Sequence, residues 1–232
     1  DSLSPCGTRL TTYEATYPRS IHAEILTHKM LSRNSASSRA IPTEKLIQRV
    51  IDDPFIPMYI GANQKGMQAG AELGEEDRGR ALDVWRGTRD QAVIHARRML
   101  ECGVHKQVVN RLIEPWLWIT VIISGTSWDN FFGLRDHQDA EPHFQHLARL
   151  MRAARDLSIP TVLKAGEWHT PLAPIDEADE LALRAYVDRS FGATGPIVPG
   201  EAELAYRQAL RKVSVGRVAR VSYLSHVGRR DI

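Results

Sequence analysis

Hydroxyl, amide and guanidinium groups gather in one segment of the chain, residues 27–42. Four serines, one asparagine and two arginines fall within residues 32–42. Such donors together suit an anion, most often a phosphate. A polar loop that caps neighbouring helices has a similar composition, because Ser and Asn are favoured at helix ends and turns. Composition therefore leaves an anion site and a capping loop both open.

A second group of reactive side chains consists of His137, His143 and His146, with Asp136 and Asp139 beside them. His143 and His146 are three residues apart, so on a helix they share a face and can bind a divalent metal. This spacing makes a metal-dependent hydrolase the alternative enzyme class. The apolar stripe of the same helix consists of Phe144, Leu147 and Leu150, so the histidines fit its solvated polar face better than a metal site, and no second carboxylate cluster has ligand spacing.

The elements that must position these residues follow from apolar periodicity. Helices are predicted over residues 20–31, 43–52, 75–102, 104–114, 140–157, 177–189 and 201–213, with Gly103 as the C-cap of the longest. Residues 120–123 are β-branched and predict a buried strand, although a buried helix fits nearly as well. Residues 55–74 and 191–200 are expected to be irregular, 158–173 to be loop or short strand, and 218–224 to be strand or helix.

Composition bounds the class of protein. The chain has 232 residues, 43% of them hydrophobic and 25% charged, with a net charge of +2. This composition is that of a globular protein, and the charge is too small for nucleic-acid binding through bulk electrostatics. No stretch approaches the roughly 20 apolar residues of a membrane span, and no signal-peptide pattern occurs. Two cysteines and no linker or repeat predict a single domain over residues 1–232 in the cytoplasm.

The order of residues in the polar segment resembles a motif of the flavin-dependent thymidylate synthases. That family carries Arg-His-Arg, seven residues, Ser, and Arg two positions later. Here Thr27-His28-Lys29 is followed after seven residues by Ser37, with Arg39 two further on. Thr27 and Lys29 replace the two arginines, Ser35 replaces a glutamate and Ala40 a tyrosine.

Three further segments resemble the same family. Residues 103–115 are similar to a helix with a nucleotide-binding arginine, here Arg111. Residues 127–135 resemble an Asn-Phe-x-x-Leu-Arg segment, so that Asn130 matches a flavin contact and Arg135 the arginine that reads uracil. Residues 215–223 resemble the element that begins the usual member, which is typical of a long, circularly permuted branch.

The resemblance implies a mixed α/β (α+β) fold, a central sheet flanked by helices. It also implies a homotetramer whose active sites combine several subunits. The implied reaction is C5-methylation of UMP or dUMP, with methylenetetrahydrofolate as carbon donor and FAD reduced by NADPH. The implied substrate residues are Glu24, Ser35, Ser37, Arg39, Arg111 and Arg135, the last also catalytic. The implied cofactor residues are His28, Lys29, Ser124, Asn130, Arg217, Arg220 and Ser222, and no metal, nucleic-acid or membrane partner is implied.

Two points bear on substrate and mechanism. A related branch of the family methylates UMP for nucleoside antibiotics such as polyoxin, and the small Ser35 and Ala40 leave room for a ribose hydroxyl, which favours UMP acceptance.

Cys102 ends a predicted helix, where the dipole disfavours a thiolate, and Cys6 lies near the start, so neither is expected to be a nucleophile. The substitutions at Thr27, Lys29 and Ser35 also permit a nucleotide-binding oligomer without catalysis.

Overall fold

A five-stranded mixed sheet organises the structure, which is a computed structural model describing residues 1–68, 70–174, 176–192 and 199–221. The long strands β2 (Arg9–Pro18) and β4 (Trp118–Gly125) pair antiparallel from Thr11↔Gly125 to Pro18↔Trp118. The short strands β3 (Ser32–Ser35), β1 (Ser2–Leu3) and β5 (Thr161–Val162) complete the order β3-β4-β2-β1-β5. Only β5 runs parallel to its neighbour, β1. The expected mixed α/β fold with a central sheet is confirmed.

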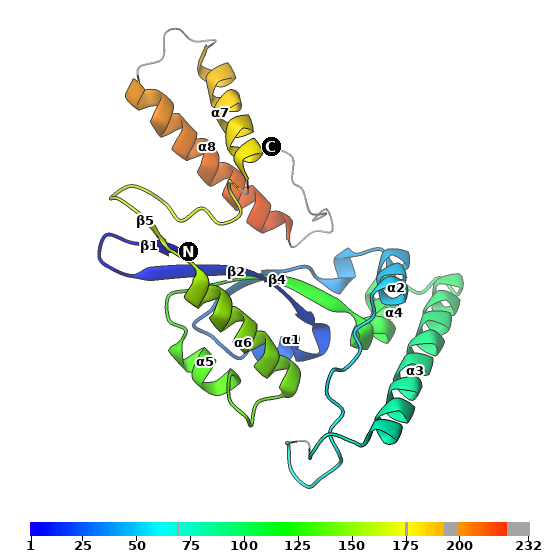
Figure 1. Cartoon of the computed structure of the whole chain (residues 1–232). Coiled ribbons are helices and arrows are strands. Elements are labelled where there is room, and N and C mark those ends of the chain that lie inside the picture. The colour runs from blue at the N-terminus through cyan, green and yellow to red at the C-terminus, as the bar shows by residue number, and fades with distance from the viewer. Residues whose placement is uncertain (69, 175, 193–198, 222–232) are drawn as a thin grey trace.

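Helices cover one face of this sheet. The short α1 (His22–Ile25), which follows the 3-10 turn η1 (Arg19–Ile21), lies there with α5 (Asp129–Arg135) and α6 (Pro142–Leu157) (Figure 1). Alternate residues of β4 point into this layer, because successive side chains of a strand face opposite sides. Ile119, Val121 and Ile123 are therefore buried against an aromatic cluster of Trp128, Phe131, Phe132 and Phe144.

Gly125 is where β4 comes closest to this cluster. A Cβ atom at that position would lie 2.7 Å from Cδ2 of Leu31 and 3.4 Å from the Trp128 ring. The Nε1–H of Trp128 donates to the Gly125 carbonyl oxygen at 2.8 Å. The absence of a side chain at Gly125 thus lets the chain turn tightly from β4 into α5, which carries Arg135.

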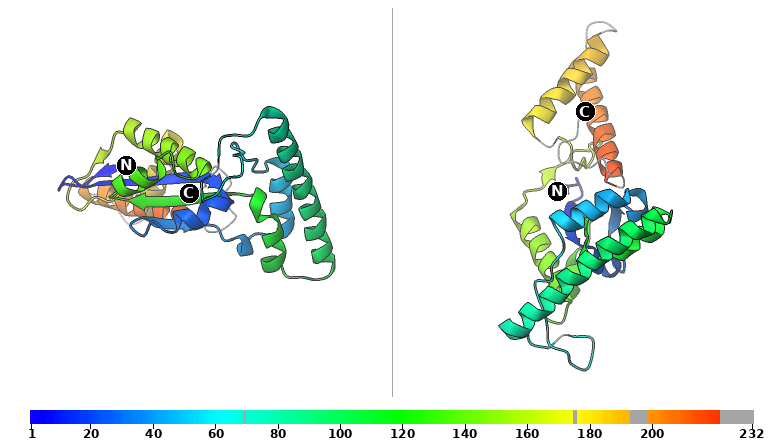
Figure 2. Two further views of the ribbon diagram at one scale, coloured as in Figure 1. Left: turned by 90° about the horizontal axis from the view of Figure 1, so that it is seen from below. Right: turned by 90° about the vertical axis from the view of Figure 1, so that its right-hand side faces the viewer.

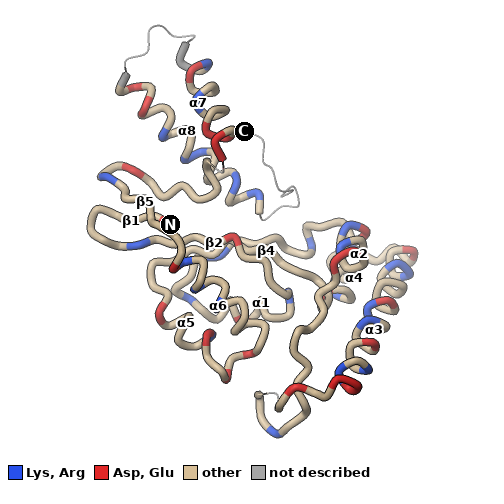
Figure 3. Tube along the Cα trace, viewed as in Figure 1, with Lys and Arg blue, Asp and Glu red and all other residues tan. Residues whose placement is uncertain are grey.

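A second helical layer lies beside one end of the sheet (Figure 2). It contains α2 (Thr43–Asp52), α3 (Glu75–Glu101), α4 (Lys106–Val109) and the 3-10 helices η2 (Ser38–Ala40) and η3 (Asn110–Trp116). Leu82, Val93 and Ala96 of α3 are buried and form its inward face. Gly103 has φ +76°, as its predicted C-cap role requires. Acidic and basic residues are interspersed along the length of α3 (Figure 3).

The remaining helices, α7 (Glu177–Gly192) and α8 (Pro199–Arg220), form a hairpin on the other side of the sheet (Figure 1). A small core of its own holds the hairpin together, with Leu183 and Val187 of α7 against Ala205 and Ala209 of α8. The Nδ2 of Asn34 in β3 donates to the Val218 carbonyl oxygen at 2.6 Å and ties α8 to the sheet. Within the described ranges, no helix has both the length and the apolar character to cross a membrane.

Three local predictions are wrong or incomplete. The helix expected over 20–31 ends at Ile25, because Thr27 turns the chain: its Oγ1 donates to the Glu24 carbonyl oxygen at 2.6 Å. Met30, within the expected range of that helix, is 76% exposed. The segment 104–114 is divided between α4 and η3, where Pro115 cannot donate a helical hydrogen bond. Strand β2 was not predicted, whereas residues 120–123 do form the expected strand, within β4.

Candidate functional site

Arg135 and Glu24, two of the predicted substrate residues, line a cavity of about 710 Å³. The cavity lies between α1, the end of α5, the start of α6 and the segment 59–68. Its volume is in the range of small-molecule sites. The other polar residues that line it are Tyr59, Gln68, Gln138, Asp139, Glu141, His143 and Gln145.

The Arg135 guanidinium is held by three groups from distant parts of the chain. Its Nε–H donates to Nε2 of His28 at 2.9 Å, and its Nη1 donates to Oε2 of Glu24 at 3.1 Å. Its Cζ lies 4.4 Å from the centroid of the Phe144 ring. Nη2 makes no hydrogen bond to any described residue, so the side chain keeps an oriented pair of donor hydrogens for a ligand.

His28 holds the Arg135 guanidinium in this orientation. Its ring is 8% exposed and meets the edges of Phe131 and Phe144, with centroid distances of 5.0 and 6.0 Å. Burial, followed by the positive charges of Arg135 and Arg33, lowers the pKa of His28 below its ordinary value. A neutral ring that accepts at Nε2 carries its proton on Nδ1. His28 therefore positions Arg135 and is not itself a cation in this arrangement.

The Arg135 cluster, namely Glu24, His28 and Arg135, can recognise a flat polar ligand. An arginine with fixed orientation donates to carbonyl oxygens and stabilises negative charge that develops on them, most strongly where water is excluded. The Arg135 side chain is 21% exposed, and the Glu24 carboxylate, 40% exposed, can accept from an N–H or O–H group. The cluster thus offers both a donor and an acceptor at one wall of the cavity.

The predicted phosphate residues Ser35, Ser37 and Arg39 do not line this cavity. Ser35 ends β3, while Ser37 and Arg39 flank or lie in η2, and both of these are exposed. The fully buried Asn110 holds η2 in place, because its Nδ2 donates to the carbonyl oxygens of Ser38 at 2.7 Å and Ile41 at 3.1 Å. Arg111 follows Asn110 directly, so this network brings the predicted phosphate segment next to a second predicted substrate residue.

The predicted cofactor residues do not form one site within a single chain. His28 lies on the helix-covered side of the sheet, whereas Ser124 lies on the other side, with its Oγ 2.7 Å from Oγ1 of Thr12. Lys29 in the turn between α1 and β3, Asn130 in α5 and Arg220 in α8 are each exposed. Ser222 lies outside the described residues. The donors suit a diphosphate chemically, but one chain does not gather them around a flavin.

Arg217 has a structural partner. Its side chain is 3% exposed, and Nη1 and Nη2 each lie 2.5 Å from a carboxylate oxygen of Asp179 in α7. Nη1 also donates to the Leu172 carbonyl oxygen at 2.8 Å. Holding a cofactor with this guanidinium would require the buried ion pair to open, so its cofactor role stays a prediction.

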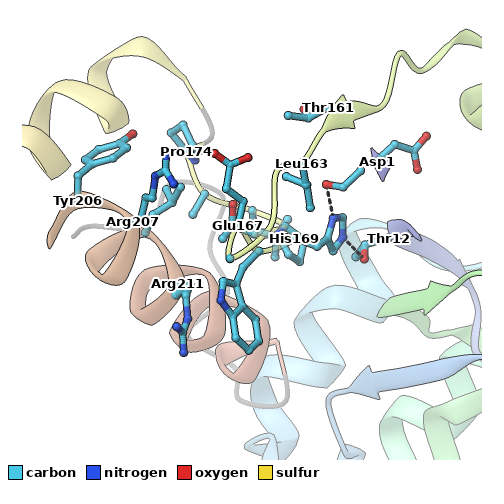
Figure 4. Close-up of a pocket in the computed structure, with 18 of the residues that line it drawn as sticks. Asp1, Thr12, Thr161, Leu163, Glu167, His169, Pro174, Tyr206, Arg207 and Arg211 are labelled. Atoms are coloured by element: carbon cyan, nitrogen blue, oxygen red, sulfur yellow. Dashed lines mark hydrogen bonds and ion pairs between the residues drawn. The ribbon is translucent and has the colours of Figure 1, made fainter. Parts of the chain in front are cut away.

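A further cavity, of about 550 Å³, lies between the sheet and α8 (Figure 4). His169, which sequence reasoning did not single out, crosses from the loop to the sheet: Nδ1 lies 2.8 Å from Ser2 Oγ and Nε2 2.8 Å from Thr12 Oγ1. Burial lowers the pKa of His169 to about 4. An isolated histidine in a loop gives no sequence signal of such a bridge.

The alternative metal site has no structural support. Among the residues that the structure describes, no group of three or more His, Cys, Asp or Glu side chains could hold a metal ion. His146 is exposed, and His143 is engaged elsewhere: Nδ1 lies 2.5 Å from Glu141, and Nε2 accepts from the Met58 N–H at 3.1 Å.

The two cysteines differ in environment. Cys102 is exposed at the end of α3 and lines none of the cavities described above, and Cys6 is exposed in the turn between β1 and β2. Hydrogen bonds, first from Ser4 and then from Thr8, lower the pKa of the Cys6 thiol to about 7. Cys6 is thus more acidic than the sequence alone indicates, but it lies apart from the Arg135 cluster in the fold.

Comparison with known proteins places the fold. No family model matches the chain, and no curated protein matches it in sequence. The chain has the fold of a nucleotide methylase. One matching structure is that of the UMP/dUMP methylase PolB from Streptomyces cacaoi bound with 5-Br UMP, with a TM-score of 0.53 and 14% identity over 63% of this chain and 67% of that chain. A structure of PolB with 5-Br dUMP aligns with a TM-score of 0.47 and 13% identity, over 63% and 65% of the two chains.

Proposed function

We propose that this protein methylates C5 of a pyrimidine nucleoside monophosphate, UMP or dUMP. The observation that carries the proposal is the Arg135 cluster at the wall of a cavity, in a chain that shares its fold with a UMP/dUMP methylase. In this reaction Arg135 donates to a uracil carbonyl oxygen and Glu24 accepts from the nucleotide. The guanidinium then stabilises the negative charge that the ring acquires when N3 or C5 reacts.

The proposal includes FAD, methylenetetrahydrofolate and NADPH, on the strength of the sequence resemblance. The flavin supplies hydride and methylenetetrahydrofolate supplies the carbon. Because one chain leaves the predicted cofactor residues on both sides of the sheet, we propose a homotetramer in which different subunits complete each flavin site. The chain's own contribution is to bind and orient the nucleotide and to hold Arg135 through His28 and Glu24.

Reconstitution tests this function directly. Protein mixed with FAD, methylenetetrahydrofolate, NADPH and UMP should form 5-methyl-UMP, measured by mass spectrometry, and the flavin should remain with the protein on gel filtration at the size of a tetramer. Failure of flavin to bind, together with no methylated product from UMP or dUMP, would exclude the proposal. Nucleotide binding without product would favour a non-catalytic role. The ratio of kcat/KM for UMP and dUMP tests UMP acceptance, which a strong dUMP preference would contradict.

Replacing Arg39 by Ala should weaken nucleotide binding. Arg39 is exposed on η2 and forms no ion pair with any residue that the structure describes, so its removal costs a charge-assisted contact with phosphate of about 1.5–3 kcal/mol and little folding stability. Titration calorimetry with UMP measures this loss. Arg49→Ala, an exposed arginine on the neighbouring α2, is the matched control. Unchanged UMP affinity in Arg39→Ala would remove Arg39 from the site. Unchanged affinity together with a lower melting temperature would indicate that Arg39 only caps the neighbouring helix.

A further inference from the structure

Two arginines share one carboxylate beside the predicted phosphate segment. Nε of Arg19 lies 3.2 Å from Oε1 of Glu114, and Nη1 of Arg111 lies 3.2 Å from Oε2 of the same residue. Glu114 is the one carboxylate paired with either guanidinium among the described residues. The Ser38 hydroxyl also donates to Oε1 of Glu114, at 2.6 Å. The group therefore carries one positive charge more than its carboxylate can balance.

Other charged residues lie around this group, including Asp52 and Asp53, which line a separate cavity together with Arg19 and Ser38. Lys106 adds a further cation, since its Nζ donates to the Ala40 carbonyl oxygen at 3.3 Å, and Arg39 lies in the same η2 turn. His22 adds no charge: burial, followed by the positive charges of Arg19 and Arg33, lowers its pKa below the ordinary value. An ion pair that served stability alone would need one guanidinium. The second, on Arg111, has a 59% exposed side chain and is not required for packing.

Arg19, Arg111 and Glu114 line a cavity of about 480 Å³. The cavity is lined by Arg19, Ser20, His22, Ala23, Leu26, Arg111, Glu114 and Pro115, so the shared carboxylate faces it together with both guanidinia. Ala23 and Glu24 are neighbours in α1, so this cavity and the one that contains the Arg135 cluster lie against the same short helix. Two guanidinia and a hydroxyl are donors that phosphate oxygens prefer, and the cavity gives a phosphate room to reach them.

We propose that Arg19 and Arg111 form an anion site for a phosphate monoester, and that the Glu114 carboxylate is an internal counter-ion that sets its affinity. The inference rests on the proposed function, because the phosphate that it places there is the one on the nucleotide substrate. Arg19 becomes a substrate-binding residue that the sequence motifs do not mark. Glu114 competes with phosphate for the same N–H donors and holds both guanidinia in position while the site is empty of ligand.

Substitution of each partner gives opposite expected results. Arg19→Gln removes one cation and should weaken binding of UMP and of inorganic phosphate about tenfold, which is about 1.4 kcal/mol, while uridine binding stays unchanged. Glu114→Gln keeps an acceptor for the Ser38 hydroxyl but removes the competing charge, so it should strengthen binding of UMP and phosphate several-fold. Arg86→Gln, which breaks an exposed ion pair with Asp83 on α3, is the matched control and should change nothing.

The measurement is titration calorimetry of the full chain with UMP, uridine and inorganic phosphate at fixed ionic strength. Wild-type affinity for UMP in Arg19→Gln, or unchanged or weaker binding in Glu114→Gln, would overturn the site, as would failure of wild-type protein to bind either phosphate compound. If Arg19→Gln does not fold, Arg19→Lys and Glu114→Gln still decide. Arg19-dependent binding of UMP and phosphate without any methylated product would defeat the proposed function and leave the anion site standing. Methylation with normal UMP affinity in Arg19→Gln would do the reverse.

Discussion

Replacing Arg135 by Ala should lower kcat for methylation by about 10²-fold or more while the protein stays folded. The reason is electrostatic: the guanidinium is oriented by His28 and Glu24 and lines the cavity, so it can stabilise charge on the uracil ring only in the reacting state. Flavin binding should be largely retained, because Arg135 belongs to the nucleotide side of the proposed site. Single-turnover methylation, followed by mass spectrometry, measures the effect on the chemical step.

The chain offers a close control for Arg135. Arg152 has the same kinds of contact: Nε lies 2.9 Å from a carboxylate oxygen of Asp136, and Cζ lies 4.8 Å from the centroid of Phe132. Arg152 does not line the cavity of the Arg135 cluster. Arg152→Ala should therefore lose similar packing and ion-pair energy but keep near wild-type turnover. Equal loss in both variants would indicate a structural role for Arg135.

Substitution of Cys102 tests the rival mechanism, in which a cysteine thiolate attacks the nucleotide. Cys102→Ser should leave turnover within a few-fold of wild type, because the thiol is exposed at the end of α3 and lines no cavity near Arg135. If Cys102→Ser were inactive while Arg135→Ala remained active, a covalent thiolate mechanism would replace the one proposed here.

Apolar periodicity predicted the helices that bury a regular stripe. Thr43–Asp52 and Pro142–Leu157 have such stripes, and both helices are present near the expected bounds. Strand β2 was missed, although Thr11, Ala15 and Tyr17 are buried at alternate positions, because exposed Glu14 and Thr16 and the polar start weaken the pattern. The helix expected over 20–31 ends at Ile25, where the hydroxyl of Thr27 binds the Glu24 carbonyl oxygen. Beyond that turn His28 contacts Phe131, a tertiary contact that periodicity along one segment cannot reveal.

The candidate site followed from motifs, not from local pattern. The resemblance named Glu24, His28 and Arg135 individually, and the structure brings these three together across sequence separations of 107 and 111 residues. The structure does not bring the predicted cofactor residues together within one chain. Arg19 and Glu114 were missed, since an isolated arginine and glutamate 95 residues apart, at positions 19 and 114, carry no sequence signal until the fold joins them.

Replacing Arg217 by Ala should destabilise the α7–α8 hairpin by about 3–5 kcal/mol. The substitution leaves the Asp179 carboxylate, 10% exposed, without its bidentate guanidinium partner, and a buried charge that loses its partner is costly. It also removes the hydrogen bond to Leu172, through which the loop before α7 is held against α8. Because the hairpin has its own small core, the loss should appear there first, as faster hydrogen exchange and proteolysis within residues 177–220.

Arg220, three residues further along α8 and exposed, is the matched control, and Arg220→Ala should change hydrogen exchange in the hairpin little. The two roles considered for Arg217 give different results, which makes this comparison decisive. A flavin ligand would lose flavin affinity on substitution with the hairpin intact, whereas a structural arginine would loosen the hairpin whether or not flavin is present. Normal exchange protection in Arg217→Ala, together with lost flavin binding, would mean that the ion pair with Asp179 opens to receive the cofactor. Lost protection in the flavin-free protein would fix Arg217 as the residue that anchors α8 to α7, and the diphosphate would then need its cations from other elements or from another subunit.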